Sequence, residues 1–210
     1  DKDIREELFD FLEEEFGRIR IIEEKTMGRS RADVVMVMEA ALAGIEIKSD
    51  ADTYTRLESQ VRDYDSFFDY NIAAVGTRHA AHVAEHIPDW WGIITIEELD
   101  GRIDCYYYRR MQPNPAPVSL KKQLSFLWRP ELAHLQELNG MYRYAEKSKL
   151  FVIGKLLEET EPEILKAELC SELFERDYNE IAGQIEAYRA SHRTGGCRGK
   201  RGSRRRRRLR

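Results

Sequence analysis

The sequence has few cysteines and no long apolar run, and these two shortages exclude several classes of protein. Its cysteines, Cys105, Cys170 and Cys197, lie too far apart to form a CxxC pair, a four-thiolate metal cluster or a disulfide framework. Isolated thiols are typical of a reducing compartment, so we expect a cytoplasmic protein. No apolar stretch approaches the roughly 20 residues that span a bilayer, so no membrane segment is expected.

Outside the C-terminal end, positive charge is outweighed by negative charge. Ten of the 34 Lys and Arg residues lie between Arg193 and Arg210, where there is no acidic residue, so residues 1–192 carry 24 basic and 38 acidic groups and a net charge of −14. A body this acidic does not bind DNA through its overall field, so any handling of nucleic acid requires a local site. The basic tail at 191–210 is expected to be disordered, and it fits a phosphate-binding arm and a non-native end equally well.

Hydrophobic periodicity predicts an α/β fold with a central mixed sheet flanked by helices. The apolar positions of the N-terminal segment follow helical spacing, and the segments after it have short apolar or alternating patterns typical of strands. The predicted elements are a helix at 3–16, strands at 18–24, 33–38 and 43–48, a helix to about residue 70, a strand at 71–76, a short helix at 78–86 and a strand at 91–96.

Proline placement divides the chain. Residues 112–118 hold three of the six prolines and predict a linker between a core at 1–111 and an all-helical appendage at 119–190, which lacks strand signals. The stretch Ser148 to Leu157 resembles the second helix of a SAP module, which binds DNA. The strongly acidic segment 158–180 favours packing or dimerisation at least as well, so a homodimer or a protein partner is the alternative use of the appendage.

Three charged residues interrupt the predicted strands. Asp33 opens the second strand, and Glu46 and Lys48 lie two positions apart on the third, so the latter two point to the same face. Asp33 lies beside Glu46 if the two strands are neighbours. Two carboxylates suit Mg²⁺ or Mn²⁺, and an adjacent ammonium suits phosphodiester chemistry. An ordinary solvated ion pair is the alternative, but buried charge is costly unless it is paired or metal-bound.

The segments around these residues resemble the PD-(D/E)XK nuclease superfamily, in particular its RecB-like and MmcB-like small bacterial or phage branch. The resemblance is carried by Gly28-Arg29-Ser30-Arg31-Ala32-Asp33, by Gly44-Ile45-Glu46-Ile47-Lys48 and by Gln60-Val61-Arg62-Asp63-Tyr64. It implies a restriction-endonuclease-like core and a metal-dependent nuclease that hydrolyses DNA in repair, phage or defence. It also implies that Gln60 and Tyr64 act beside Asp33, Glu46 and Lys48. Ala32 replaces the usual Pro, and the four cysteines of iron–sulfur members are lacking.

The resemblance further implies a third acidic residue near the metal. Glu24 is our choice, Glu23 and Glu7 compete with it, and a solvent-facing strand end is an equally good interpretation of Glu24. Four arginines flank the expected site and are predicted to contact phosphates, with solvated surface groups as the alternative. These are Arg29, Arg31, Arg56 and Arg62.

Other patterns have a functional and a structural interpretation. His79, His82 and His86 share one helix face and predict either a metal-binding face or plain surface histidines. Trp90-Trp91 and Tyr106-Tyr107-Tyr108 either stack on bases or pack at the core. Two further functions compete with a nuclease, namely a non-catalytic nucleic-acid-binding protein on the same fold and a helical protein-interaction adaptor.

Overall fold

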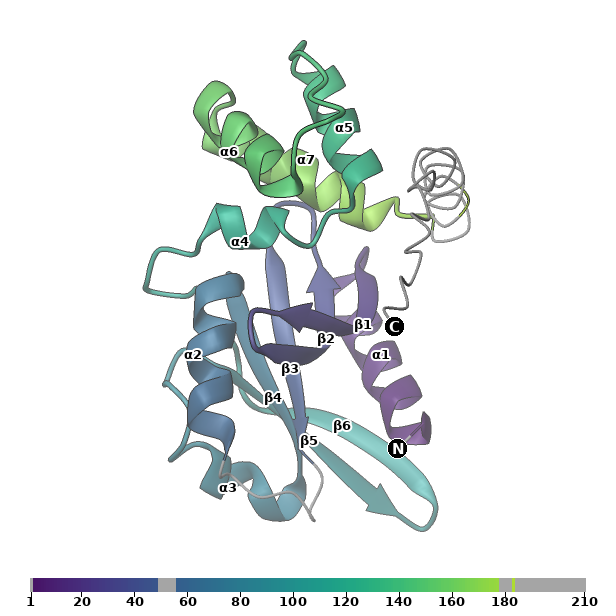
Figure 1. Cartoon of the computed structure of the whole chain (residues 1–210). Coiled ribbons are helices and arrows are strands. Elements are labelled where there is room, and N and C mark those ends of the chain that lie inside the picture. Colours follow the sequence, from purple (N-terminus) through teal and green to yellow (C-terminus); the bar gives the residue numbers. More distant parts are fainter. Residues whose placement is uncertain (1, 49–55, 178–182, 184–210) are drawn as a thin grey trace, which may run out of the picture. The chain divides into compact units, whose positions relative to one another are not determined.

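A computed structural model describes residues 2–48, 56–177 and 183 of the chain (Figure 1). The helices are α1 (Lys2–Phe16), α2 (Leu57–Phe67), η2 (Thr77–His79, a 3₁₀ helix), α3 (Ala80–Val83), α4 (Leu120–Leu124), α5 (Arg129–Leu138), α6 (Lys149–Glu159) and α7 (Pro162–Phe174). The strands are β1 (Arg20–Met27), β2 (Ser30–Val37), β3 (Leu42–Lys48), β4 (Tyr70–Gly76), β5 (Gly92–Leu99) and β6 (Arg102–Arg109). The predicted α/β class is confirmed.

The six strands form one mixed sheet in the order β1-β2-β3-β4-β5-β6. The first three strands are an antiparallel meander, β3, β4 and β5 are parallel, and β6 returns antiparallel to β5. Helix α2 connects β3 to β4, and η2 and α3 connect β4 to β5, as parallel neighbours require. The all-apolar run of β4 fits this interior position, where both faces are covered.

Alternation along the strands divides the core between the two faces of the sheet. Val34 and Met36 of β2 pack with Leu8 and Leu12 of α1, whereas the intervening residue Val35 packs on the other face, which α2 and α3 cover. Figure 1 shows α1 and α2 on opposite sides of the sheet. The odd-numbered positions of β2 therefore point toward α2, and Asp33 is one of them.

Helices α4 to α7 pack within the same compact unit as the sheet, which comprises residues 1–175. Phe126 stacks on Phe67 and Phe68 at the end of α2. The predicted linker has neither helix nor strand, and the Asn114 side chain donates hydrogen bonds to the carbonyl oxygens of Asp65 (2.8 Å) and Phe68 (3.0 Å). These contacts hold the segment after β6 against the C-terminal end of α2.

Two elements differ from the sequence-based expectation. Strand β6 was not predicted, although Ile103, Cys105 and Tyr107 alternate inward along it. The predicted helix at 78–86 is a 3₁₀ turn followed by one short α-helix. None of the helices described is both long enough and apolar enough to cross a bilayer. The predicted tail at 191–210 lies outside the described residues. So do Asp50, Asp52 and Thr53, whose side chains the sequence predicts as N-caps for the helix that runs to about residue 70.

Candidate active site

Strands β2 and β3 bring the two predicted carboxylates together on the α2 face of the sheet. Val34 pairs with Ile45 in the antiparallel register, so Asp33 and Glu46 occupy the next facing positions. The backbone N–H of Ile47 donates a hydrogen bond of 2.9 Å to Oδ2 of Asp33. The predicted neighbourhood of Asp33 and Glu46 is therefore present in the structure.

Glu46 is the centre of a closed hydrogen-bonded ring, and only 2% of the residue is exposed. Its Oε1 lies 2.7 Å from Nζ of Lys48 and accepts a hydrogen bond of 2.5 Å from Nε2 of Gln60. Oε1 of Gln60 in turn accepts a hydrogen bond of 3.2 Å from Nζ of Lys48. Gln60 thus fixes the carboxylate and the ammonium at once, because its amide carries both a donor and an acceptor.

Tyr64 holds the other oxygen of the same carboxylate. Its fully buried ring packs against Phe68 and Trp91, with ring centroids 5.4 Å away in each case. Its hydroxyl donates a hydrogen bond of 2.8 Å to Oε2 of Glu46 and accepts one of 3.3 Å from the backbone N–H of Asp33. One turn of α2 separates Gln60 from Tyr64, so both reach Glu46 from the same helix face.

The electrostatics of this cluster favour a cation. Burial, and then the charge of Asp33, raise the pKa of Glu46 above its usual value, although Lys48 and Tyr64 act in the opposite direction. Burial and the two carboxylates also raise the pKa of Tyr64 well above its usual value, so the phenol keeps its proton. The charge of Asp33 disfavours the ionised form of Glu46, and a divalent ion bound between the two carboxylates would offset this repulsion.

Asp33 and Glu46 together supply a number and a type of ligand, namely two carboxylates, that suit a magnesium or manganese ion. Mg²⁺ keeps several waters and is commonly held by one or two carboxylates together with substrate phosphate. Within the described ranges, no group of three or more His, Cys, Asp or Glu side chains is placed to hold a metal. Two protein carboxylates, with water and phosphate completing the coordination, are therefore the arrangement that these residues support.

The structure does not bring the expected third acid into the site. Glu24 has a positive φ of 52°, and its side chain is 56% exposed and paired with Arg31 at 3.2 Å. Of its competitors, Glu23 pairs with Arg5 at 3.2 Å, and Glu7 lies near Cys105 on the α1 face. None of the three acids lines the cavity described below.

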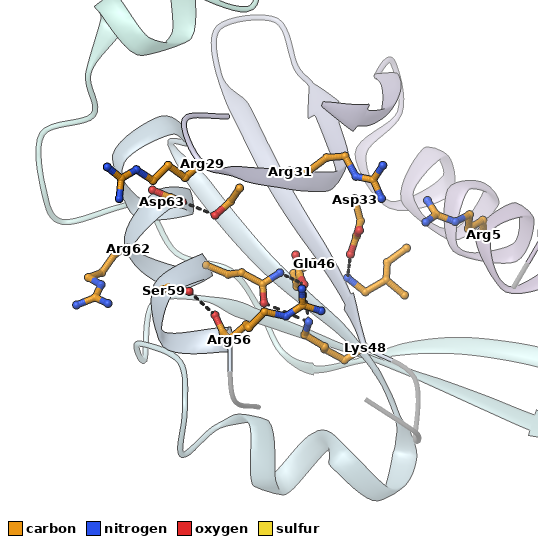
Figure 2. A pocket seen from close by; sticks show the side chains of 13 residues that line it. Arg5, Arg29, Arg31, Asp33, Glu46, Lys48, Arg56, Ser59, Arg62 and Asp63 are labelled. Carbon is orange, nitrogen blue, oxygen red and sulfur yellow. Dashed lines mark hydrogen bonds and ion pairs between the residues drawn. The ribbon is translucent and has the colours of Figure 1, made fainter. Parts of the chain in front are cut away.

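An open cavity of about 840 Å³ lies above this cluster (Figure 2). Its charged lining has six basic and three acidic side chains, in a chain whose first 192 residues are net −14. The basic ones are Arg5, Arg29, Arg31, Lys48, Arg56 and Arg62, and the acidic ones are Asp33, Glu46 and Asp63. All four predicted arginines thus gather around the predicted carboxylates, and Arg5 of α1 joins them without having been predicted.

Two of the arginines are free to meet a ligand. In the described part of the chain, no carboxylate pairs with Arg29 or Arg56, whereas Arg62 lies 3.7 Å from Glu58. Figure 2 shows Arg29 and Arg62 on one side of the carboxylates and Arg5 and Arg31 on the other, with Arg56 over the middle.

A side-chain contact ties the β1–β2 turn to α2. Ser30 donates a hydrogen bond to Oδ2 of Asp63, one residue from the turn arginine Arg29. Gly28 has a φ of 59° at this turn, a backbone conformation that favours glycine. The turn and the first half of α2 are consequently held together as two walls of the cavity.

The remaining candidates lie elsewhere. Trp91 is fully buried, and its Nε1 donates a hydrogen bond of 2.8 Å to Asp65, so it belongs to the core. Tyr107 packs on Phe11 of α1, whereas Tyr106 and Tyr108 are exposed on β6. The histidines at 79, 82 and 86 lie on η2, on α3 and just after it, outside the cavity.

Metal uptake by the carboxylate pair gives a direct test of the site. We expect Mn²⁺ to bind the full chain with a stoichiometry of one, and Asp33→Asn to weaken this binding by at least about tenfold, because a charged oxygen ligand is lost. Isothermal titration calorimetry in a metal-free buffer measures both. Asp63→Asn is the matched control, since Asp63 lines the same cavity but lies outside the pair. Equal binding by the Asp33→Asn chain would contradict the assignment.

The chain belongs to the family described as bacteriophage P4 protein cII, which it matches over residues 1–191. No curated protein matches the sequence. Among solved structures, SfsA of Pyrococcus furiosus in complex with Ca²⁺ is similar at 17% identity with a TM-score of 0.31. The match covers 52% of this chain and 60% of SfsA, so the chain spans less than two thirds of that protein. A likeness this low supports no conclusion about fold or function.

Proposed function

We propose that this protein is a divalent-metal-dependent nuclease that hydrolyses phosphodiester bonds, with DNA as its substrate. The observation that carries the proposal is the meeting of Asp33, Glu46, Lys48, Gln60 and Tyr64 in one arginine-lined cavity. The meander β1-β2-β3 and the crossover through α2 to β4 fit a restriction-endonuclease-like core of the PD-(D/E)XK kind. Membership in a bacteriophage protein family fits a phage setting.

The charge distribution supports a phosphate-bearing substrate. The first 192 residues repel a polyanion as a whole, because their net charge is −14. The cavity lining reverses that sign, with six basic groups against three acidic ones. A local excess of positive charge in the cavity lining attracts a phosphate backbone to the carboxylate pair.

In the proposed reaction, Asp33 and Glu46 would hold the metal ion. A bound divalent ion would supply Lewis-acid chemistry at the scissile phosphate and would make water a better nucleophile. Lys48 orients the attacking water or stabilises the charge that develops on phosphorus, and its contacts with Glu46 and Gln60 fix its position. Tyr64 keeps its proton and holds Glu46 through a hydrogen bond from its hydroxyl to Oε2.

Arg29 and Arg56 give the proposed substrate contacts a measurable signature. We expect Arg29→Ala and Arg56→Ala each to lower the slope of log K against log salt for DNA binding, by about 0.7 to 0.9 per lost phosphate contact. Binding is followed by fluorescence anisotropy in EDTA, so that no cleavage intervenes. Lys121→Ala removes an exposed cation of α4 outside the cavity and is expected to leave the slope unchanged. The same slope in all four proteins would argue against phosphate binding in the cavity.

The activity itself is tested with labelled single- and double-stranded DNA incubated with Mg²⁺, with Mn²⁺ or with EDTA. We expect cleavage in the presence of metal and none in EDTA. The product ladder then distinguishes cutting at ends from cutting within the strand. Intact substrates under every condition would overturn the nuclease proposal.

A second candidate is a DNA-binding protein that does not cut. Both oxygens of Glu46 are already engaged within the protein, and the described residues supply only two carboxylates at the site. The arginine-lined cavity would still bind phosphates. A shift of DNA mobility without cleavage, together with no Mn²⁺ uptake, would favour this candidate.

A further inference from the structure

A group of exposed aromatic rings lies in the helical part of the chain, at the loop between α5 and α6. Tyr142 is 76% exposed, and its ring centroid lies 5.2 Å from that of Tyr144. The ring of Phe151, on the first turn of α6, is also exposed, and its centroid lies 5.2 Å from that of Tyr144, which is half-buried against the core. Leu150 beside them is 66% exposed. We refer to Tyr142, Tyr144 and Phe151 as the aromatic platform.

The backbone under the platform is held firmly. The side chain of Gln136, which is buried, donates a hydrogen bond of 2.8 Å to the carbonyl oxygen of Tyr142. Arg129 donates one of 2.8 Å to the carbonyl oxygen of Tyr144. The helix that follows begins with a capped turn, because Oγ of Ser148 accepts a hydrogen bond from the N–H of Phe151. The rings of Tyr142 and Phe151 are therefore presented to solvent on a preorganised support, which lowers the entropy cost of binding.

The loop that carries the rings has more basic than acidic residues. Residues 142–151 contain Arg143, Lys147 and Lys149 against the single acid Glu146, in a chain whose first 192 residues are net −14. Nζ of Lys147 lies 5.5 Å from the ring centroid of Phe151. Exposed rings bordered by cations match a strand of unpaired bases, whose faces stack on aromatic side chains while its phosphates meet the cations. An acidic protein surface would match the cations but would leave the highly exposed ring of Tyr142 without a specific role.

We propose that the aromatic platform is a binding site for single-stranded nucleic acid, with Tyr142 stacking on a base and Arg143 and Lys147 meeting phosphates. Because every type of base has a flat face that can stack on an aromatic ring, such a site binds without a recognition sequence. The platform shares no residue with the lining of the cavity. It therefore binds whether or not the cavity cuts DNA, and the proposal does not rest on the nuclease function.

The test uses the full chain, a short fluorescein-labelled oligothymidylate and EDTA, with affinity read from fluorescence anisotropy. We expect Tyr142→Leu to weaken binding by about 5- to 150-fold, which is the range for loss of one stacked base. Leucine keeps an apolar side chain, so the loss reports on the ring. Arg143→Gln is expected to lower the salt slope by about 0.7. Tyr108→Leu is the matched control, because Tyr108 is also an exposed tyrosine, at 55%, but lies on β6.

The same Tyr142→Leu effect is expected in a chain that also carries Arg29→Ala and Arg56→Ala, since the two sites share no side chain. An unchanged affinity for Tyr142→Leu, or an equal loss for Tyr108→Leu, would overturn the platform. A change of self-association in ultracentrifugation with unchanged oligonucleotide binding would identify a protein interface and would also overturn it. Platform binding without cleavage would remove only the nuclease proposal.

Discussion

Replacement of Glu46 by Gln, or of Lys48 by Met, is expected to reduce metal-dependent DNA cleavage by about 10²- to 10³-fold, which is the usual effect of removing one preorganised electrostatic group. Glu46→Gln keeps the shape of the side chain and its hydrogen bonds with Tyr64 but removes the negative charge that would hold the metal. Lys48→Met keeps the length of the stem and removes the ammonium, which lies 2.7 Å from Glu46. Single-turnover cleavage of a labelled strand measures both losses.

Two further measurements separate a catalytic defect from a folding defect. Lys155→Met breaks an exposed Lys–Glu pair of the same length, 2.7 Å, on α6, and is expected to cleave like the wild type. Thermal unfolding of each variant shows whether the fold survives, which matters for Lys48→Met because it leaves Glu46 buried without its cation. A Glu46→Gln chain that is folded and cleaves at the wild-type rate would exclude the proposed site.

The sequence predicts the centre of this site because that centre depends on short-range periodicity. Glu46 and Lys48 share a face because they lie two apart on a strand. Gln60 and Tyr64 were implied by the resemblance to PD-(D/E)XK nucleases, and their spacing of four residues explains why both lie on one helix face. Only the pairing of β2 with β3 had to be assumed, and the Val34–Ile45 register supplies it. Local spacing plus one strand pairing is sufficient to place Asp33 as well.

The parts that sequence reasoning missed depend on packing between distant segments. Arg5 belongs to α1, on the other face of the sheet, yet its side chain lines the cavity. No spacing rule links residue 5 to residues 33 or 46. Glu24 fails to reach it because a positive φ turns this residue out of the strand alternation. A backbone irregularity of this kind has no clear signal in a non-glycine residue. In contrast, the alternation of Ile103, Cys105 and Tyr107 was present in the sequence and would have indicated β6.

Gly44 is the position where a single methyl group is expected to damage both the fold and the site. It lies on β3 two residues before Glu46, and a Cβ atom there would fall 2.3 Å from the ring of Phe68 and 2.6 Å from the ring of Tyr64. Both rings are fully buried, so they can be displaced to admit the methyl group only at the cost of other packing contacts. We expect Gly44→Ala to destabilise the protein by about 2–3 kcal/mol and to lower the unfolding midpoint by roughly 4–12 °C.

The same displacement would separate the Tyr64 hydroxyl from Glu46, so cleavage is expected to fall even at temperatures where the variant remains folded. Gly154→Ala is the matched control, because its Cβ meets no atom within 4 Å and the substitution lies within α6. There alanine should stabilise the helix by up to about 1 kcal/mol. Adding Phe68→Leu to Gly44→Ala should recover part of the loss, because it removes ring atoms that the new methyl group meets. A Gly44→Ala chain as stable and as active as the wild type would show that α2 does not press on β3 as closely as these distances require.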